Sequence, residues 1–255
     1  MSGALPEFFR AVALDETGST NDDAIAAARA GAPEGTLIWA RRQTKGRGRR
    51  GRAWVSPAGN LHLSLVLRPD VPPSRAGELA FVAALAAAEA CAGLARGADV
   101  RCKWPNDVLV NGRKTAGLLI ESSITGAALE WVVVGIGINL AAHPDDAEYP
   151  ATHLAAHAGR AIPVDEAMAA LGAAFAGRYD EWRRLGFKPV REAWLARAAG
   201  IGGPVRVRLE SSEFTGTFVG IDGEGALIVA LPDGRTRRVT AGDVFFPVPG
   251  DAPAR

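Results

Sequence analysis

The sequence predicts an α+β protein in which a mixed, mainly antiparallel sheet flanked by helices precedes a small β-barrel of SH3-like size. Two apolar segments, Thr36–Trp39 and Leu61–Leu67, have the composition of buried strands, and Asn111-Gly112 is a strong signal for a two-residue hairpin. Five short alternating segments crowd the C-terminal part of the chain. We therefore expect a larger domain over residues 1–199 and the barrel over residues 203–249.

The first helix is predicted to begin at Ser19-Thr20-Asn21 and to end at Gly31, with Pro33 beyond it. Ser19 or Thr20 can cap this helix, which is the ordinary use of such residues. Hydroxyls and an amide at a helix N-terminus also make a good polar wall for a pocket. The sequence at this point leaves both interpretations open.

A loop rich in glycine and arginine, Gln43–Trp54, lies between the two predicted buried strands. Glycines let a backbone approach a ligand closely, and arginines supply forked donors that match carboxylate and phosphate oxygens. A nucleic-acid contact and a solvated, disordered segment are the competing interpretations. The spacing fits neither a P-loop nor a dinucleotide-binding turn. Because core strands flank the loop, we favour a lid that folds over an anion.

The distribution of charge narrows the choice of anion. The chain has 29 Lys plus Arg and 28 Asp plus Glu, so it lacks the net positive field of a general nucleic-acid binder. Seven of the twelve residues from Arg41 to Arg52 are basic, which leaves the rest acidic on balance. Such a local positive charge favours a small anionic ligand over a long polyanion.

The middle of the chain predicts one helix and several strands. An alanine-rich helix near residues 76–95 is apolar on most faces and is expected to pack closely against the sheet. A strand over residues 99–104 places Lys103 on the face opposite Cys102 and ends at Pro105.

A hairpin over residues 108–121 leads to the long buried strand Ala128–Asn139. Gly135 and Gly137 lie inside this strand, where glycine is unfavourable unless something must approach the backbone. We favour a bound ligand over a bulge as the reason for these two glycines.

Helices are predicted over residues 151–157, 164–184 and 188–197, and Gly200–Pro204 is the expected boundary. The strands of the barrel are expected at Val205–Leu209, Phe214–Ile221, Ala226–Ala230, Arg235–Val239 and Asp243–Phe246.

Cysteine and histidine usage indicates an ordinary cytoplasmic protein. Cys91 and Cys102 show no paired spacing and are expected to be reduced, buried thiols. His153 and His157 are four residues apart, but no acid completes a metal motif, so we expect a surface or packing role. No export signal is apparent, and Glu89 interrupts the most apolar helix, so no membrane span is expected.

Several motifs occur together in order along the chain. They are Ser19-Thr-Asn21, Gln43 with Gly46-Arg-Gly-Arg-Arg-Gly-Arg-Ala-Trp54, Lys103-Trp-Pro-Asn-Asp107, Lys114-Thr-Ala-Gly117 and Gly135-Ile-Gly-Ile-Asn139. Their combination is similar to the biotin protein ligase family over roughly residues 12 to 249. The resemblance implies the class II synthetase-like catalytic fold of biotin ligases and the small C-terminal barrel. Family members that repress transcription carry an N-terminal helix-turn-helix, but here the catalytic region begins near Met1, so DNA binding is not implied.

The resemblance implies a biotin–[biotin carboxyl carrier protein] ligase. Such an enzyme activates biotin with ATP and Mg²⁺ as biotinyl-5′-AMP and transfers it to a lysine of a carrier domain of a carboxylase. Its catalytic residues would be Lys103 and Arg49. The resemblance also allows a homodimer, and it leaves open what the barrel and the C-terminal tail contribute.

The same resemblance assigns two sets of binding residues, and it assigns no metal ligand. Biotin would contact Ser19, Thr20, Asn21, Gln43, Gly46, Arg47, Gly48, Arg49, Lys103, Gly117, Gly135 and Gly137. The nucleotide would contact Arg49, Arg50, Arg52, Trp54, Asn106 and Asn139.

Two other functions compete with this one. Lipoate or octanoate attachment shares the general catalytic architecture, but the Gly-Arg-Gly-Arg-Arg-Gly-Arg run disfavours it. A non-catalytic RNA-binding module could use the arginine loop and the barrel. That reading leaves Lys103-Trp-Pro-Asn-Asp107 and Gly135-Ile-Gly-Ile-Asn139 unexplained.

Overall fold

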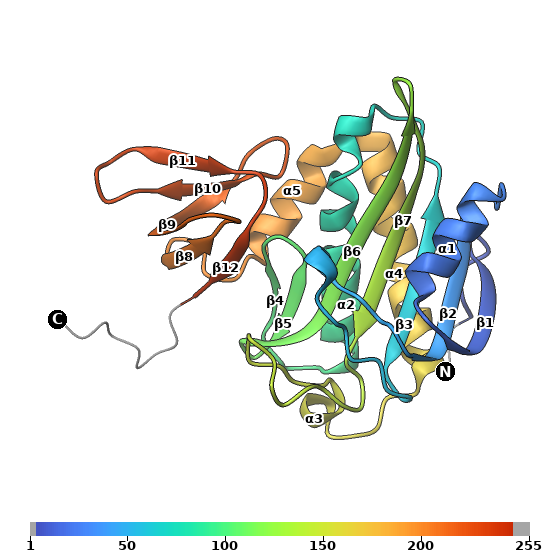
Figure 1. The fold of residues 1–255 in the computed structure, drawn as a ribbon. Helices are drawn as coiled ribbons and strands as arrows, with labels where there is room; N and C mark the ends of the chain where they lie inside the picture. The colour runs from blue at the N-terminus through green and yellow to red at the C-terminus, as the bar shows by residue number, and fades with distance from the viewer. Residues whose placement is uncertain (1–3, 247–255) are drawn as a thin grey trace.

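A seven-stranded sheet forms the larger part of the fold (Figure 1). The computed structural model describes residues 4–246, so residues 247–249 of the predicted barrel and most of the C-terminal tail lie outside the described residues. Only the β1–β2 pair is parallel, which confirms a mixed, mainly antiparallel sheet. From edge to edge the strands are β1 (Arg10–Thr17), β2 (Thr36–Gln43), β3 (Leu61–Leu67), β7 (Ala128–Ile138), β6 (Arg113–Thr125), β5 (Asp107–Val110) and β4 (Val100–Lys103).

Helices cover both faces of this sheet, which explains why its central strands are apolar on both sides (Figure 1). α1 (Thr20–Arg29) lies on one face, and α2 (Glu78–Leu94) and α4 (Val164–Leu185) lie on the other. α5 (Phe187–Ala196) extends that second layer toward the C-terminal strands. The alanines of α2 permit the close packing expected for it.

By length and composition alone, the segment Pro73–Leu94 could cross a membrane. In the structure 61% of its most apolar window is buried inside the fold, where α2 packs against the sheet, α4 and α5. Its hydrophobicity is that of a core helix.

The hairpin that joins β5 to β6 has the predicted turn. Asn111 and Gly112 both have positive φ, 48° and 75°, as a two-residue turn with the twist of the flanking strands requires. The turn sets the register of β6 on β5, and β5 pairs on its other side with β4.

A second sheet of five antiparallel strands follows α5 and confirms the five predicted short strands. Its edge strands, β11 and β12, are separated by only three residues of chain. Four strand spacings amount to about 19 Å, whereas that link spans at most about 14 Å, so the sheet must curl as in an SH3-like barrel. The strand order is β11 (Thr236–Val239), β10 (Leu227–Ala230), β9 (Glu213–Ile221), β8 (Pro204–Arg208) and β12 (Asp243–Phe245).

The barrel is fixed to the larger sheet by buried contacts. The Trp104 indole donates a hydrogen bond to the carbonyl of Gly225 (3.0 Å), and Arg191 of α5 donates to the carbonyl of Ile221 (2.8 Å). A Cβ at Gly225 would lie 2.5 Å from the Phe81 ring of α2. The boundary predicted between residues 199 and 203 is consistent with β8 beginning at Pro204, and it stays a prediction.

One predicted helix is largely wrong. Instead of a helix over 151–157, the structure has only α3 (Ala155–Ala158). The backbone before it pairs with the start of β6, because Lys114 donates to the Pro150 carbonyl and Thr152 donates to the Lys114 carbonyl. Groups committed to this bridge cannot form helical hydrogen bonds.

Candidate active site

A row of five residues crosses the sheet and forms the floor of a cavity of about 450 Å³. Strand register places Lys103, Asp107, Gly117, Gly137 and His62 opposite one another on β4, β5, β6, β7 and β3. Directly paired residues point to the same face of a sheet. The floor therefore carries charge at one end, a histidine at the other and two glycines between them.

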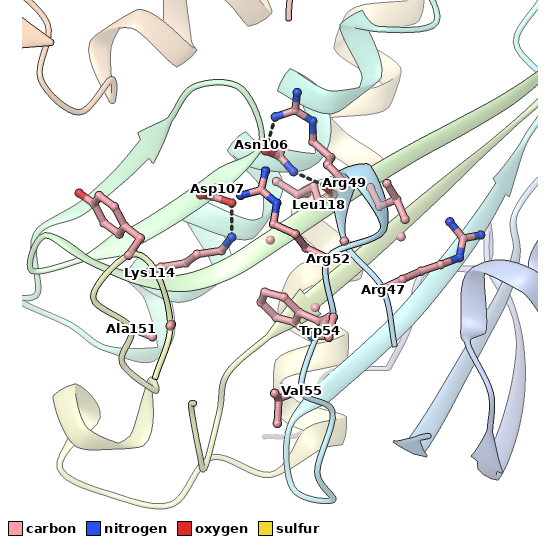
Figure 2. A pocket seen from close by; sticks show the side chains of 18 of the residues that line it. Arg47, Arg49, Arg52, Trp54, Val55, Asn106, Asp107, Lys114, Leu118 and Ala151 are labelled. Atoms are coloured by element: carbon pink, nitrogen blue, oxygen red, sulfur yellow. Dashed lines mark hydrogen bonds and ion pairs between the residues drawn. The ribbon is translucent and has the colours of Figure 1, made fainter. Parts of the chain in front are cut away.

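The Trp54 indole lies across these two glycines. A Cβ at Gly137 would come within 2.5 Å of the indole, and one at Gly117 within 3.0 Å. Glycine is thus required at both positions by packing of this side chain, not only by a ligand as the sequence suggested. The ring spans the middle of the cavity in Figure 2, with Arg52 on one side and Lys114 on another.

Hydroxyl and amide groups gather where α1 begins. Thr20 donates its backbone N–H to Gln43 Oε1 (2.8 Å), and its hydroxyl lies 2.8 Å from the Ser64 hydroxyl. Ser19 occupies the N-cap position, as the sequence predicts, but its side chain makes no cap hydrogen bond. The Asn21 side chain joins the same group, because its Oδ1 accepts a hydrogen bond from the Ser64 hydroxyl (2.5 Å).

This polar group continues outward to the arginine loop. Since Asn21 Oδ1 accepts from Ser64, its amide nitrogen is left to donate to Glu121 Oε2 (2.8 Å). Arg47 donates to Glu121 Oε1 (3.0 Å) and to Asp22 Oδ1 (2.6 Å), which tethers one end of the loop to β6 and α1. A Cβ at Gly135 would collide with Asn21 Oδ1 at 2.1 Å, so this glycine leaves room for the amide.

Lys103 is a buried cation at the opposite end of the floor. Only 6% of the residue is exposed, and its Nζ lies 3.7 Å from Asp107 Oδ2. Burial lowers the pKa of Lys103 to about 8, although Asp107 opposes the shift. Asp107 also pairs with Lys114 Nζ at 2.6 Å. The ammonium is therefore incompletely neutralised, as suits a group that receives an anion.

The second half of the loop lies against the barrel. Arg49 donates to Asn106 Oδ1 (3.3 Å), in the turn that follows Lys103 (Figure 2). Asp243 of β12 pairs with Arg52 (2.7 Å), Arg50 (3.5 Å) and Arg49 (3.8 Å). One barrel carboxylate thus holds three loop guanidiniums. The structure brings Lys103 and the arginine loop to a single cavity.

Two predicted contact residues do not line this cavity. Gly46 lies against Gln43, Ser56 and the Trp54 carbonyl, so a Cβ there would collide at 2.5 Å. Arg50 turns outward at a positive φ of 56°. The predicted residues that line the cavity are Ser19, Thr20, Asn21, Gln43, Arg47, Gly48, Arg49, Arg52, Trp54, Lys103, Asn106, Gly117, Gly135, Gly137 and Asn139.

Sequence reasoning missed several side chains at the site. His62 and Ser64 were detectable, because two polar residues alternate on one face of an otherwise apolar strand. Glu121 carried a weaker signal as a charge that follows the apolar run Leu118–Ile120 within β6. Asp243 carried none, since its place depends on how the barrel docks.

The cysteines and histidines have the structural roles that their spacing predicts. Cys91 and Cys102 are buried and unpaired, and burial raises the pKa of each to about 12. His157 contacts Asn111 and Thr152, and His153 stacks on His143. Over residues 4–246, His, Cys, Asp and Glu form no group of three that could hold a metal ion.

Comparison with known proteins identifies the family. Residues 17–139 match the model of the biotin/lipoate A/B protein ligase family, and residues 200–246 match that of the biotin protein ligase C-terminal domain. The biotin–[acetyl-CoA-carboxylase] ligase of Paracoccus denitrificans is 45% identical over 240 residues, 91% of this chain and 99% of that protein. The chain belongs to the biotin protein ligase family.

Other biotin protein ligases extend the likeness to sequence and fold. The bifunctional ligase/repressor BirA of Bacillus subtilis is 37% identical over 90% of this chain and 72% of its own length. Biotin protein ligase from Aquifex aeolicus, solved with biotin and ATP, has a TM-score of 0.79 and 27% identity over 92% of this chain and 97% of that one. These matches confirm the predicted family and fold class.

Proposed function

We propose that this chain activates biotin with ATP to form biotinyl-5′-AMP and then transfers biotin to a lysine of a biotin carboxyl carrier domain. The observation that carries the proposal is the shared cavity, which brings Lys103 and Arg49 together with the hydroxyl and amide end and the Trp54 indole. The named activities of the similar proteins support it.

The first step joins two anions, which is why fixed cations are needed. A carboxylate oxygen of biotin attacks the α-phosphorus of ATP, and the bond to the departing pyrophosphate breaks. Negative charge grows on the phosphoryl oxygens during this exchange. Lys103 at the end of β4 and Arg49 from the loop would hold the two groups together and stabilise that charge.

The hydroxyl and amide end suits the ureido ring of biotin. Thr20 and Asn21 present donors and acceptors whose directions are fixed by Ser64 and Glu121, and the Gln43 amide is oriented by Thr20 and Ser56. A ring that both donates and accepts through its N–H and carbonyl groups needs such a mixed set. The fixed orientations lower the entropy cost of binding.

The indole of Trp54 is the proposed platform for adenine, and Asn139 is proposed to bond its edge. Asn139 is held by a hydrogen bond to the Thr152 carbonyl (3.2 Å). Mg²⁺ would enter with ATP, bound to triphosphate oxygens and water, since residues 4–246 provide no three-ligand cluster for it. There it would neutralise part of the phosphate charge.

In the second step a carrier lysine, as its free amine, attacks the carbonyl carbon of the mixed anhydride. The bond to the phosphate oxygen breaks, AMP leaves, and the amine loses its proton. Water is the competing nucleophile, so the loop must cover the intermediate until the carrier arrives. The two buried thiols are consistent with work in the reducing cytoplasm.

Incubation with ATP, Mg²⁺, biotin and a carrier domain tests the proposal by intact mass of the carrier. We expect one biotinyl addition that depends on ATP and on the acceptor lysine. Lipoate and octanoate in place of biotin serve as competing substrates. Labelling by these acids but not by biotin, or salt-sensitive RNA binding without ATP turnover, would overturn the assignment.

A further inference from the structure

Two aromatic rings from distant parts of the chain enclose the ammonium of Lys103. The Tyr149 ring, in the segment between β7 and α3, has its centroid 3.6 Å from Lys103 Nζ. The Phe245 ring, in β12 of the barrel, lies 5.7 Å from the same atom. Both distances fall within the range in which a cation is attracted to a ring face.

The carboxylates near Lys103 neutralise its ammonium only in part, so attraction to the two rings can add to its stabilisation. Asp107 is its nearest carboxylate at 3.7 Å, but Lys114 takes the other oxygen of Asp107 at 2.6 Å. Asp243 acts on Lys103 from the barrel, where it is already paired with loop arginines. The ammonium is therefore removed from water with only part of a counter-charge.

We propose that Tyr149 and Phe245 form an aromatic clamp that positions the Lys103 ammonium where the carboxylate and the phosphate meet. This inference rests on the proposed function. Tyr149 is a positioning residue, because it acts through Lys103. The barrel supplies the more distant side of the clamp through Phe245, whose ring also contacts the guanidiniums of Arg206 (4.5 Å) and Arg208 (4.8 Å).

The clamp depends on the ring and not on the phenol hydroxyl. A π face replaces part of the lost hydration of the ammonium and keeps it charged near neutral pH, whereas an aliphatic cover of similar size only excludes water. Phenylalanine at position 149 should therefore preserve the effect and leucine should lose it. This contrast separates the clamp from simple packing of the segment.

Three variants test the clamp in biotin-dependent pyrophosphate exchange between pH 6.5 and 9.5. Y149L should move the alkaline limb of kcat/KM to lower pH by about one unit, which lowers kcat/KM about twofold at pH 7 and about tenfold at pH 9. Y149F should restore the wild-type plateau and limb. F214L is the matched control, because the Phe214 ring covers the Arg237 guanidinium at 4.1 Å in the barrel, outside the cavity.

A readout without turnover keeps this inference separate from the proposed function. The chain has only four lysines, so the Lys103 side chain can be followed by lysine NMR titration. Burial lowers the pKa of Lys103 to about 8, and we expect Y149L to lower this pKa further while Y149F leaves it unchanged. Equal titrations for wild type and Y149L, or equal losses in Y149L and Y149F, would overturn the clamp. Failure of wild type to exchange pyrophosphate would instead overturn the function.

Discussion

Several residues at this site matter because they leave space for a neighbouring side chain or fix its orientation. Gly137 leaves room for the Trp54 indole, and Ser64 leaves the Asn21 amide only one orientation. Lys103 is a buried lysine, and its proposed role is to receive anions away from water. Each of these roles predicts a different consequence of substitution.

Removing the Lys103 charge should abolish most of the activation step. We expect Lys103→Ala to lower biotin-dependent pyrophosphate exchange by roughly 10²-fold, as loss of a preorganised charge donor does. The fold should remain, since a costly buried cation is removed. Circular dichroism and thermal unfolding check the fold, and Lys188→Ala on α5 is the control. Exchange at the wild-type rate would exclude Lys103 from the chemistry.

Adding a methyl group at Gly137 should displace Trp54, because a Cβ there lies 2.5 Å from the ring. We expect Gly137→Ala to raise the KM for ATP about tenfold through loss of the stacking platform, worth on the order of 1 kcal/mol or more. Gly177→Ala is the matched control, since a Cβ at Gly177 meets nothing within 4 Å and helix propensity favours alanine. An unchanged KM for ATP would show that the indole is not the platform.

At the scale of elements, helices, strands and turns that depend on neighbouring residues in the sequence were predictable. Features that depend on contacts between distant residues were not. The hairpin at Asn111-Gly112 and the strands followed from turn chemistry and side-chain period. The short α3 and the tether of the loop by Glu121 depend on groups far away in sequence. Sequence identified Lys103 and the arginine loop because their motifs are local, but it could not show that Asp243 meets them.

The arginine loop is held at both ends, by Glu121 and Asp22 at Arg47 and by Asp243 at Arg52. Arg49 lies between these anchors and lines the cavity, where its proposed role is to hold the adenylate. We expect Arg49→Ala to release biotinyl-5′-AMP faster, with indiscriminate labelling of lysines on a bystander protein. Mass spectrometry of that bystander measures the leak. Arg184→Ala, in an exposed ion pair of α4, is the control.

Wild-type retention and selectivity in Arg49→Ala would mean that Arg49 is only a solvated charge. Faster release without loss of the first step would instead separate retention from activation within the same loop. Two arginines of the loop would then have different roles, anchoring by Arg47 and retention by Arg49.

At the scale of the whole molecule, the barrel forms one wall of the cavity and is not simply a domain that comes after it in the chain. Its strand β12 contributes Asp243 to the loop and Phe245 to the ring pair around Lys103. Trp104 and Arg191 hold the barrel against the larger sheet through backbone carbonyls. Movement of the barrel would therefore change the surroundings of both the arginine loop and Lys103.

Neutralising Asp243 tests this coupling directly. Burial raises the pKa of Asp243, yet bonds and charges from Arg52, Arg208 and Arg49 together lower it below its ordinary value. The group therefore stays ionised across any assay pH, and substitution is needed to remove its charge. In Asp243→Asn the loop guanidiniums lose a shared carboxylate that is only 13% exposed, so their mutual repulsion should loosen the lid.

We expect Asp243→Asn to shorten the lifetime of bound biotinyl-5′-AMP about tenfold, the equivalent of roughly 1.4 kcal/mol. Rapid gel filtration of the loaded enzyme measures that lifetime. Asp233→Asn is the matched control, because Asp233 pairs with Arg235 in the same barrel but at an exposed turn. If both variants retain the adenylate as wild type does, Asp243 has only a packing role and the arginine loop closes without its charge. If only Asp243→Asn leaks, the barrel controls how long the reactive anhydride is kept from water.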